Sequence, residues 1–387
     1  MKKLLISILQ PVYAISMAGL LYSCGSPEPT VPVRFYVGSS DGSLAHSIFL
    51  CEYDPVQDRF SVLDSFAGAV GPSYLDLSPD GRFLYAIDKT VADSSGGSMT
   101  VTAFSRDPES GHLRYLNSQP SEGLGPCHIH CDAEGDYLFT SNYSSGNVAA
   151  FPLDEEGRIL PASSVAQSEG TGPVQNRQEG PHTHYVTLDP GGAYLLSPDL
   201  GADKVLNYLF DRETGTLTPN PEQPFFGLNP GSGPRHLVFH PEGNFIYIAN
   251  ELNSTVTACS YDPQTGMLNE LNTLSTVPDH REGSAYPAAI RISPDGRFVY
   301  ASTRGETSSI TAFRVEADGS ISAPDVVENV PGWPRDFNLD PSGRMLIVAG
   351  ERSQTIALYH RDINTGKLTP GGIRLDLPSP GCIFFTP

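Results

Sequence analysis

The chain reads Gly233-Pro234-Arg235-His236-Leu237-Val238-Phe239-His240-Pro241-Glu242-Gly243-Asn244-Phe245-Ile246-Tyr247-Ile248-Ala249-Asn250-Glu251 beyond its midpoint. An apolar run leads into the turn Pro241-Glu242-Gly243, and a second run rich in β-branched and aromatic residues follows, which predicts a β-hairpin. Because the strands of a hairpin are antiparallel, Arg235, His236 and Glu251 are expected at the same end. An acid, an imidazole and a guanidinium at one rim indicate either a catalytic group or a solvated edge.

The same type of turn recurs along the chain at a nearly constant interval. Its copies are Pro79-Asp80-Gly81, Ala133-Glu134-Gly135, Pro190-Gly191-Gly192, Pro241-Glu242-Gly243, Pro294-Asp295-Gly296 and Pro341-Ser342-Gly343. Each copy is followed by a second hairpin with an acidic residue and a glycine at its tip, as in Asp154–Ile159. A repeat of about 50 residues with two hairpins per unit is typical of a repeat architecture built from four-stranded sheets.

The two chain ends supply the halves of one further unit. Ser379–Pro387 matches a first strand and stops at the proline where a turn should begin, and Val33–Gly38 matches the second strand that should follow. A linear array does not need its ends to meet, whereas a closed ring does. We therefore predict an all-β, seven-bladed β-propeller over 33–387, with one blade closed by the N- and C-terminal strands. A pair of sandwich domains is the alternative, but it leaves the split unit unexplained.

The net charge of the protein limits which molecules it is expected to bind. The 387 residues carry a formal net charge of −20, which repels nucleic acid and anionic lipid, so neither is expected to bind. An anionic substrate would also be repelled at long range, so a site for one needs locally concentrated arginine. We expect a monomer that binds a small molecule, without a cofactor.

The N-terminus has the features of an export signal. Lys2 and Lys3 precede an apolar stretch that runs to Leu20-Leu21-Tyr22-Ser23-Cys24, the arrangement of a bacterial lipoprotein signal. We predict a signal peptide over 1–23, lipidation of Cys24 and an extended tether over 24–32. The protein would then lie in the cell envelope and contact the membrane only through its lipid anchor. A plain secretory peptide is the alternative.

Alignment of the units on their turn prolines shows where the repeat is broken. The residues aligned directly after the proline that opens each first strand are Ser73, Cys127, His184, Arg235, Ala288, Arg335 and Gly381, and the third unit carries an extra Gly180-Pro181-His182 just upstream. The residues at the end of each second strand are Lys89, Tyr143, Leu200, Glu251, Arg304 and Glu351. In a propeller both sets converge on one mouth of the central channel. The excess of His, Arg and Glu there is the functional signal, because a repeat scaffold supplies stability and its open end carries chemistry.

Several of these residues also have structural interpretations. His182 and His184, or the run Cys127–Cys131, have the spacing of metal ligands, but no further ligand can be assigned, so hydrogen bonding is the alternative for His128. Arg291 and Arg335 either bind substrate or form ion pairs with a neighbouring blade. Apart from Cys24, five cysteines are scattered along the chain, which is not a disulfide framework.

The sequence resembles the propeller-type lactonases, which include the bacterial 6-phosphogluconolactonases and the fungal carboxymuconate-lactonizing enzymes. The resemblance is carried by Gly180-Pro181-His182-Thr183-His184, by Gly233–Glu251 and by Thr303-Arg304, and it spans about 33–387. It implies a catalytic histidine at position 182 or 184, arginines at positions 235 and 304, an acid/base carboxylate at Glu251, and no metal.

These observations predict a hydrolase that opens a sugar-acid lactone by general-base activation of water, with arginine stabilising the oxyanion. The expected catalytic residues are Glu251, His182, His184 and Arg235. The expected substrate-binding residues are Arg304, His236, Arg291, Arg335 and His128. Two alternatives are a non-catalytic envelope propeller that binds a sugar acid or a protein, and a lactonizing cyclase that acts on an unsaturated diacid.

Overall fold

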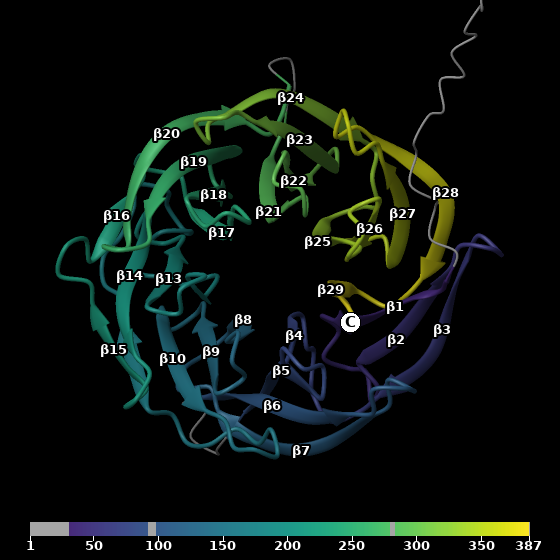
Figure 1. Ribbon diagram of the computed structural model, residues 1–387, viewed down its shortest axis with the longest axis horizontal. Coiled ribbons are helices and arrows are strands. Elements are labelled where there is room, and N and C mark those ends of the chain that lie inside the picture. The colour runs from purple at the N-terminus through teal and green to yellow at the C-terminus, as the bar shows by residue number, and fades with distance from the viewer. Residues whose placement is uncertain (1–30, 92–97, 279–282, 387) are drawn as a thin grey trace, which may run out of the picture.

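Seven antiparallel sheets are arranged in a ring around a central opening (Figure 1). The computed structural model describes residues 31–91, 98–278 and 283–386. The predicted signal peptide, Cys24 and the tether up to residue 30 lie outside the described residues. Within the described part the chain forms strands and turns but no helix, and so no helix there could cross a membrane. The predicted all-β, seven-bladed propeller is confirmed.

Each sheet is one blade, numbered here in the order in which its strands follow along the chain. Blade 1 contains β29 (Pro380–Phe385), β1 (Val33–Ser39), β2 (Ile48–Asp54) and β3 (Arg59–Phe66), and blade 2 contains β4 (Leu75–Leu77), β5 (Phe83–Val91), β6 (Met99–Arg106) and β7 (Leu113–Pro120). Blade 3 contains β8 (Pro126–Cys131), β9 (Tyr137–Asn142), β10 (Asn147–Pro152) and β11 (Ser164–Gln167), and blade 4 contains β12 (Thr187–Leu188), β13 (Tyr194–Asp199), β14 (Lys204–Asp211), β15 (Thr216–Pro219) and β16 (Phe225–Gly227).

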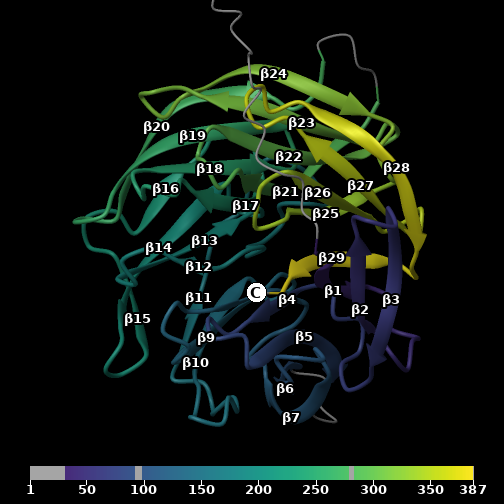
Figure 2. The ribbon, with the colours of Figure 1, turned by 45° about the vertical axis from the view of Figure 1, so that its right-hand side comes forward.

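The remaining three blades repeat the regular four-stranded pattern. Blade 5 contains β17 (Pro234–Phe239), β18 (Phe245–Asn250), β19 (Thr255–Asp262) and β20 (Met267–Ser275). Blade 6 contains β21 (Ala285–Ile292), β22 (Phe298–Gly305), β23 (Ser309–Val315) and β24 (Ile321–Glu328). Blade 7 contains β25 (Pro334–Leu339), β26 (Met345–Gly350), β27 (Thr355–Arg361) and β28 (Leu368–Asp376). The first strand of each blade lies nearest the axis, and the last strands, such as β7, β24 and β28, form the rim (Figures 1 and 2).

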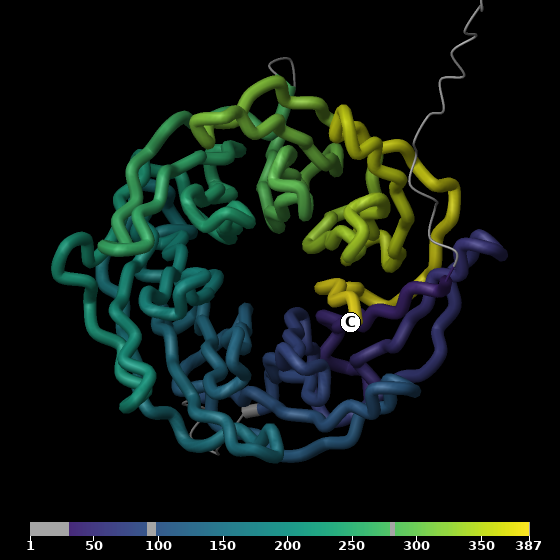
Figure 3. Tube along the Cα trace, viewed as in Figure 1, coloured from purple at the N-terminus to yellow at the C-terminus, as the bar shows by residue number. Residues whose placement is uncertain are grey.

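Blade 1 is assembled from both ends of the chain. β29 pairs with β1 in antiparallel register, with Phe35 opposite Phe385 and Val37 opposite Ile383. Figure 3 shows the yellow C-terminal segment beside the purple N-terminal one. The predicted split unit is therefore confirmed, and the ring closes at this seam.

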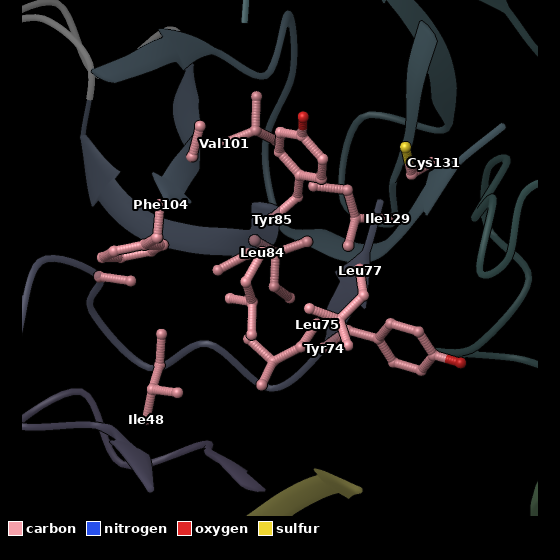
Figure 4. Close-up of a cluster of buried hydrophobic side chains, with 14 of the residues drawn as sticks. Ile48, Tyr74, Leu75, Leu77, Leu84, Tyr85, Val101, Phe104, Ile129 and Cys131 are labelled. Carbon is pink, nitrogen blue, oxygen red and sulfur yellow. The ribbon is translucent and has the colours of Figure 1, made fainter. Parts of the chain in front are cut away.

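The core lies between the blades. Side chains alternate between the two faces of a strand, yet the consecutive residues Leu84 and Tyr85 are both buried, because each face packs against a neighbouring blade. Figure 4 shows this cluster, in which Leu84 and Tyr85 of blade 2 lie near Ile129 of blade 3. Burial of both faces explains why the strands read as apolar runs without strict alternation.

In blades 2 to 7 a glycine at the tip of the second hairpin packs against the preceding blade. Gly319 has φ +84°, and a Cβ there would come within 2.1 Å of the Phe245 ring in the preceding blade. The Tyr247 hydroxyl donates a hydrogen bond to the Gly319 carbonyl at 3.2 Å. The same glycine-on-aromatic contact occurs at Gly157 with Phe83 and at Gly366 with Phe298. The spacing of the repeat is thus fixed by contacts between blades as well as within them.

Blade 4 departs from the pattern. Its first strand, β12, has only two residues, and its outer edge is divided between β15 and β16, which both pair with β14. Pro221 and Pro224 lie in the break, where a residue without an N–H cannot continue a ladder. The repeat in the sequence does not predict this division.

Candidate active site

The first and second strands of each blade deliver their functional residues to one end of the ring, here called the mouth. The Glu251 N–H donates to the Gly233 carbonyl at 2.8 Å, and the Tyr143 N–H donates to the Gly125 carbonyl at 2.8 Å. The residue after the second strand therefore lies beside the start of the first strand, as the alignment of the units predicts.

A β-bulge explains why the residue after the opening proline is special. The register of the first two strands shifts between Pro234 and His236, so that Arg235 has no partner in the ladder. Equivalent shifts leave out Cys127 in blade 3 and Arg335 in blade 7. A bulge redirects a side chain and commonly lies beside an active site. The local backbone thus turns these side chains away from the sheet.

A cavity of about 310 Å³ opens at the mouth. Its lining residues are Ser73, Lys89, Gly125, Pro126, Cys127, Tyr143, Ser144, Arg177, His184, Glu251, Arg304 and Arg335. Most of them occupy the two positions that the alignment of the units singled out. A larger depression of about 730 Å³ lies between outer hairpins of blades 1 and 2 and is lined by residues such as Leu63, Asp107 and Arg114. Charged residues and His112 also line that depression, but it lies on outer hairpins and contains none of the positions at which the repeat is broken at the mouth.

Glu251 is held by three arginines. Its Oε1 lies 2.5 Å from Arg177 Nη2, and its Oε2 lies 2.5 Å from Arg304 Nη2 and 3.0 Å from Arg235 Nε. The contacts with Arg177 and Arg304 are hydrogen bonds. The Arg235 Nε–H does not point at the oxygen and has no hydrogen-bond partner among the described residues, so that contact is an ion pair only. Both oxygens of the Glu251 carboxylate are thus paired with positively charged guanidinium groups.

These ion pairs decide the charge state of Glu251. Burial alone would raise its pKa, but Arg304, then Arg235, His184 and Arg177, hold the pKa well below its usual value. Burial, followed by repulsion from Arg304 and Arg335, lowers the pKa of Arg235 to about 9, so this guanidinium keeps its proton at pH 7. Glu251 is therefore a permanent carboxylate and a weak base.

Arg235 lies behind Glu251 and does not line the cavity. It is 1% exposed, and its Nη1 donates to the Ala288 carbonyl at 2.7 Å and to His236 Nε2 at 3.1 Å. This position allows Arg235 to fix the Glu251 carboxylate, but it does not bring the guanidinium to a substrate in the cavity.

The two candidate histidines occupy different places. His184 lines the cavity, whereas His182 does not; the His182 ring stacks on Tyr143 at 4.4 Å, and its Nδ1 lies 2.9 Å from the Tyr143 carbonyl. Burial, followed by the charge of Arg235, lowers the pKa of His184 well below 6.5, and Glu251 opposes that shift. His184 is therefore neutral at pH 7, and its imidazolium form would be stabilised by Glu251.

Aromatic and imidazole rings pack against one another below the cavity. The His128 ring lies between Tyr74 and Tyr185 at 4.0 and 3.8 Å, and His236 lies 4.9 Å from Tyr185 and 5.5 Å from His184. Both His128 and His236 are 2% exposed. The structure therefore places these two predicted substrate-binding residues beneath the cavity and not on its wall.

Of the other predicted residues, Arg304 and Arg335 line the cavity and Arg291 does not. Arg291 Nη2 donates to Asp336 Oδ1 at 2.8 Å, an ion pair between blades 6 and 7. Asp336 Oδ2 also accepts the Ile383 N–H at 3.0 Å, which ties the closing strand to this pair. Arg291 thus adopts the structural alternative considered for it, the ion pair with a neighbouring blade.

Arg177 is a cavity residue that the sequence analysis missed. It belongs to the segment between β11 and β12, which has no counterpart in the repeat, so alignment of the units passes over it. Gln178 fixes this segment, because its Nε2 donates to the Leu200 carbonyl at 2.8 Å and to Asp203 Oδ1 at 2.7 Å. Asp203 also accepts the Gly233 N–H at 2.7 Å. The length and the glycines of this inter-blade segment are the only sequence signal that marked it.

The cavity is cationic in a strongly acidic protein. Lys89, Arg177, Arg304 and Arg335 line it, and Glu251 is its one carboxylate. In the described part of the chain, no three His, Cys, Asp or Glu side chains are grouped so that they could hold a metal ion. What this arrangement can do chemically is bind an anion, hold a carbonyl oxygen that gains negative charge, and accept a proton at a neutral imidazole.

Several known proteins that are similar to this chain carry lactonase names. The family described as "Lactonase, 7-bladed beta-propeller" matches residues 34–385. A 6-phosphogluconolactonase of Bacillus subtilis is 35% identical over 351 residues, which cover 90% of this chain and 97% of the relative. A 6-phosphogluconolactonase of Formosa agariphila is 32% identical and covers 86% of this chain and 94% of its own.

A solved structure extends the comparison. The periplasmic gluconolactonase of Pseudomonas aeruginosa is 29% identical, with a TM-score of 0.85, and the match covers 92% of this chain and 99% of that one. The family match, the two relatives and the shared architecture agree with the resemblance seen in the motifs. The chain therefore belongs to the seven-bladed β-propeller lactonase family.

Proposed function

We propose that the protein hydrolyses a sugar-acid lactone in the cavity at the mouth of the propeller. The observation that carries the proposal is the Glu251 carboxylate, held by Arg177, Arg235 and Arg304 beside the neutral His184. Lactone opening needs an activated water, a group that stabilises the oxyanion and a proton for the leaving alkoxide. The cavity supplies all three with protein groups alone, and its positive charge does not favour an added metal cation.

In the proposed mechanism His184 is the general base. Its imidazole takes a proton from the water that attacks the lactone carbonyl, and the nearby Glu251 carboxylate stabilises the imidazolium that forms. Both oxygens of Glu251 are held in ion pairs with arginines, whereas the His184 ring is neutral and forms no ion pair within the described residues, so the contribution of Glu251 is electrostatic. In this mechanism the neutral His184 ring accepts the proton, and the Glu251 carboxylate stays ionised throughout.

Arg304 and Arg177 are the proposed oxyanion contacts. They line the cavity on the two oxygens of Glu251, so their guanidinium groups are positioned before substrate arrives. Once water has added, the tetrahedral intermediate collapses, the ring C–O bond breaks, and the imidazolium returns its proton to the leaving alkoxide. The product is the open-chain hydroxy acid, and His184 is neutral again.

The substrate class follows from the cationic lining and from the relatives. The curated relatives are named for a phosphorylated lactone and the solved neighbour for gluconolactone. We propose an aldonic-acid lactone as substrate. We further propose that a lipid on Cys24 anchors the chain in the cell envelope, because Lys2, Lys3 and the following apolar stretch have the features of an export signal.

A panel of substrates tests the function directly. Purified protein is mixed with 6-phosphoglucono-δ-lactone, glucono-δ-lactone and an unsaturated diacid, and proton release or uptake is followed at pH 6.5 against the uncatalysed rate. Hydrolysis of a lactone above background supports the proposal. Turnover of the diacid alone would favour a lactonizing cyclase, and binding without any turnover would favour a non-catalytic propeller.

A further inference from the structure

Two of the cations at the mouth have no counter-charge. Arg177 and Arg304 pair with Glu251. Arg335 forms no ion pair or hydrogen bond with any residue in the described part of the chain. The ammonium of Lys89 reaches only the Ser40 carbonyl, at 3.4 Å. Both side chains are half-buried, so part of their hydration is lost and is not replaced by an anion of the protein.

The two free cations also repel each other. Burial, followed by the charge of Arg335, lowers the pKa of Lys89, and Glu351 offsets only part of that shift. Like charges held together in a partly desolvated site destabilise the empty protein. A surface that carries a net charge of −20 has many carboxylates, yet none lies within ion-pair distance of either cation among the described residues. An anionic ligand is the group that would complete this arrangement.

The place of Lys89 in the ring separates it from the proposed reaction centre, whereas Arg335 lies nearer to that centre and its charge acts on Arg235 and Arg304. Lys89 belongs to β5 of blade 2 and Arg335 to β25 of blade 7, and these blades flank the closing blade 1. Glu251 follows β18 of blade 5, so β5 lies across the central opening from it (Figure 1). His184, Glu251, Lys89 and Arg335 nevertheless line one cavity. A substrate in that cavity can therefore present one end to Glu251 and the other to the free cations.

The chain packs tightly at Gly381, next to Ser73 on this side of the cavity. Gly381 is the repeat equivalent of Arg335 and Ser73, and a Cβ there would come within 2.6 Å of Ser40 Oγ and 3.0 Å of Ser73 Cα. The Ser40 hydroxyl is buried without a hydrogen-bond partner in the described structure, and Ser73 lines the cavity. Buried hydroxyls without partners are uncommon and often mark a place where a ligand or water completes the hydrogen bonds.

From this geometry we infer that Lys89 and Arg335 form an anion subsite that binds a phosphate or carboxylate group of the substrate, remote from its lactone carbonyl. The inference rests on the proposed function and adds the class of substrate to it: a lactone with a negative charge at its far end. An ammonium and a guanidinium together suit a tetrahedral phosphate or a planar carboxylate.

The test compares charged and uncharged lactones. The variants are Lys89→Gln, Arg335→Gln and the double variant, and Lys367→Gln, an exposed lysine on an outer hairpin, is the matched control. The substrates are 6-phosphoglucono-δ-lactone, a glucarolactone that carries a carboxylate, and the uncharged glucono-δ-lactone. We expect each single variant to raise KM for a charged lactone roughly 10- to 100-fold, as loss of one charge-assisted hydrogen bond would. The rise in KM for the uncharged lactone should be at least several-fold smaller, so the ratio of the two losses is the quantity that the experiment measures.

The size of the loss on each charged lactone identifies the anion. A larger rise in KM for the phosphorylated lactone assigns the subsite to phosphate, and a larger rise for the glucarolactone assigns it to carboxylate. Equal losses on charged and uncharged substrates, or no loss in the double variant, would overturn the subsite.

A binding measurement keeps the inference separate from the proposed function. If wild-type protein opens no lactone, the proposed function fails, and 6-phosphogluconate and glucarate are then titrated calorimetrically into wild type and the double variant. Binding to wild type that weakens at least roughly 10-fold in the double variant supports the subsite. Absence of binding to wild type, or equal binding to both proteins, overturns it.

Discussion

Arg235 Nε lies 3.0 Å from Glu251 Oε2, although the two residues are sixteen positions apart in the chain. The contact is produced by two local features, an antiparallel hairpin that returns the chain to its starting end and a β-bulge that removes Arg235 from the ladder. The arginine is buried and the carboxylate lines the cavity. One blade therefore supplies both the fixed negative charge of the site and the positive charge behind it.

Replacement of Glu251 by Gln is expected to affect both activity and stability. It removes the negative charge that stabilises the His184 imidazolium and that holds Arg177 and Arg304, so kcat/KM should fall at least roughly 100-fold. Loss of one partner of a buried ionic network also costs about 3–5 kcal/mol of unfolding free energy. Glu242→Gln is the matched control, because Glu242 lies in an exposed turn of the same blade and its carboxylate forms no ion pair within the described residues. Initial rates and denaturant unfolding measure the two effects. Full activity in a folded Glu251→Gln variant would falsify the electrostatic role.

The two histidines should differ sharply on substitution. His184 lines the cavity and is the proposed base, so His184→Asn should lower kcat roughly 10²- to 10⁴-fold. His182 stacks on the cavity residue Tyr143 but does not itself line the cavity, so His182→Asn should act mainly through the position of Tyr143 and cost much less. Steady-state kinetics of both variants on one lactone decide the assignment. A greater loss in the His182 variant would transfer the role of base to that ring.

Arg177 should prove as important as the arginines of the repeat. Arg177→Met removes a proposed oxyanion contact and should lower kcat/KM roughly 100-fold. Gln178→Ala tests the way Arg177 is positioned, because Gln178 ties the segment to Leu200 and Asp203 and does not line the cavity. We expect the Gln178 variant to reproduce part of the Arg177 loss at little cost in thermal stability. Wild-type kinetics in both variants would remove this segment from the site.

Lipidation of Cys24 can be tested without knowledge of the substrate. In cells that process bacterial lipoproteins, the wild-type chain should incorporate radiolabelled fatty acid and sediment with membranes. Cys24→Ala should do neither, and Cys51→Ala, which alters a buried cysteine of the propeller, should behave like wild type. Export of unlabelled wild-type protein into the soluble fraction would instead indicate a plain secretory signal.

Much of the architecture could be predicted from the sequence. The recurring Pro-x-Gly turn marks the blades, and the split unit at the chain ends indicates that the ring closes there. The same alignment brought Glu251, Arg304, Arg335 and His184 to one mouth, since a repeat makes every deviation visible. The alignment could not distinguish residues that line the cavity from residues that are buried behind it. Arg235 and Arg335 occupy equivalent bulges, yet one lies under Glu251 and the other lines the cavity.

Features that lie outside the repeat could not be predicted from it. Arg177 lies in a segment between blades 3 and 4 that has no equivalent elsewhere, and its place beside Glu251 depends on hydrogen bonds from Gln178 to residues of blade 4. The division of the outer edge of blade 4 between β15 and β16 was missed for the same reason. In both cases local insertions override the periodic pattern.

Stability should decline in mildly acidic solution because of the buried histidines. His128, His184 and His236 all have a pKa well below 6.5, for which burial is the first cause. In the unfolded chain each returns to a pKa of about 6.5, so below that pH the unfolded state binds more protons than the folded state. Unfolding free energy should then fall with decreasing pH by up to about 1.4 kcal/mol per pH unit for each histidine.

Glu251 acts in the opposite sense and in a different window. Its folded pKa is depressed, so its stabilising contribution is present above its unfolded pKa of about 4.3 and is lost only as pH falls through the folded value. Decline between pH 6.5 and 5 therefore reports the histidines alone among these groups. Denaturant unfolding from pH 8 to pH 5 measures how the unfolding free energy changes with pH. The His128→Gln variant should reduce this pH dependence by the contribution of one histidine, up to about 1.4 kcal/mol per pH unit. A flat profile down to pH 5 would contradict neutral burial of these rings, since only a group with unequal proton affinity in the two states can produce the slope.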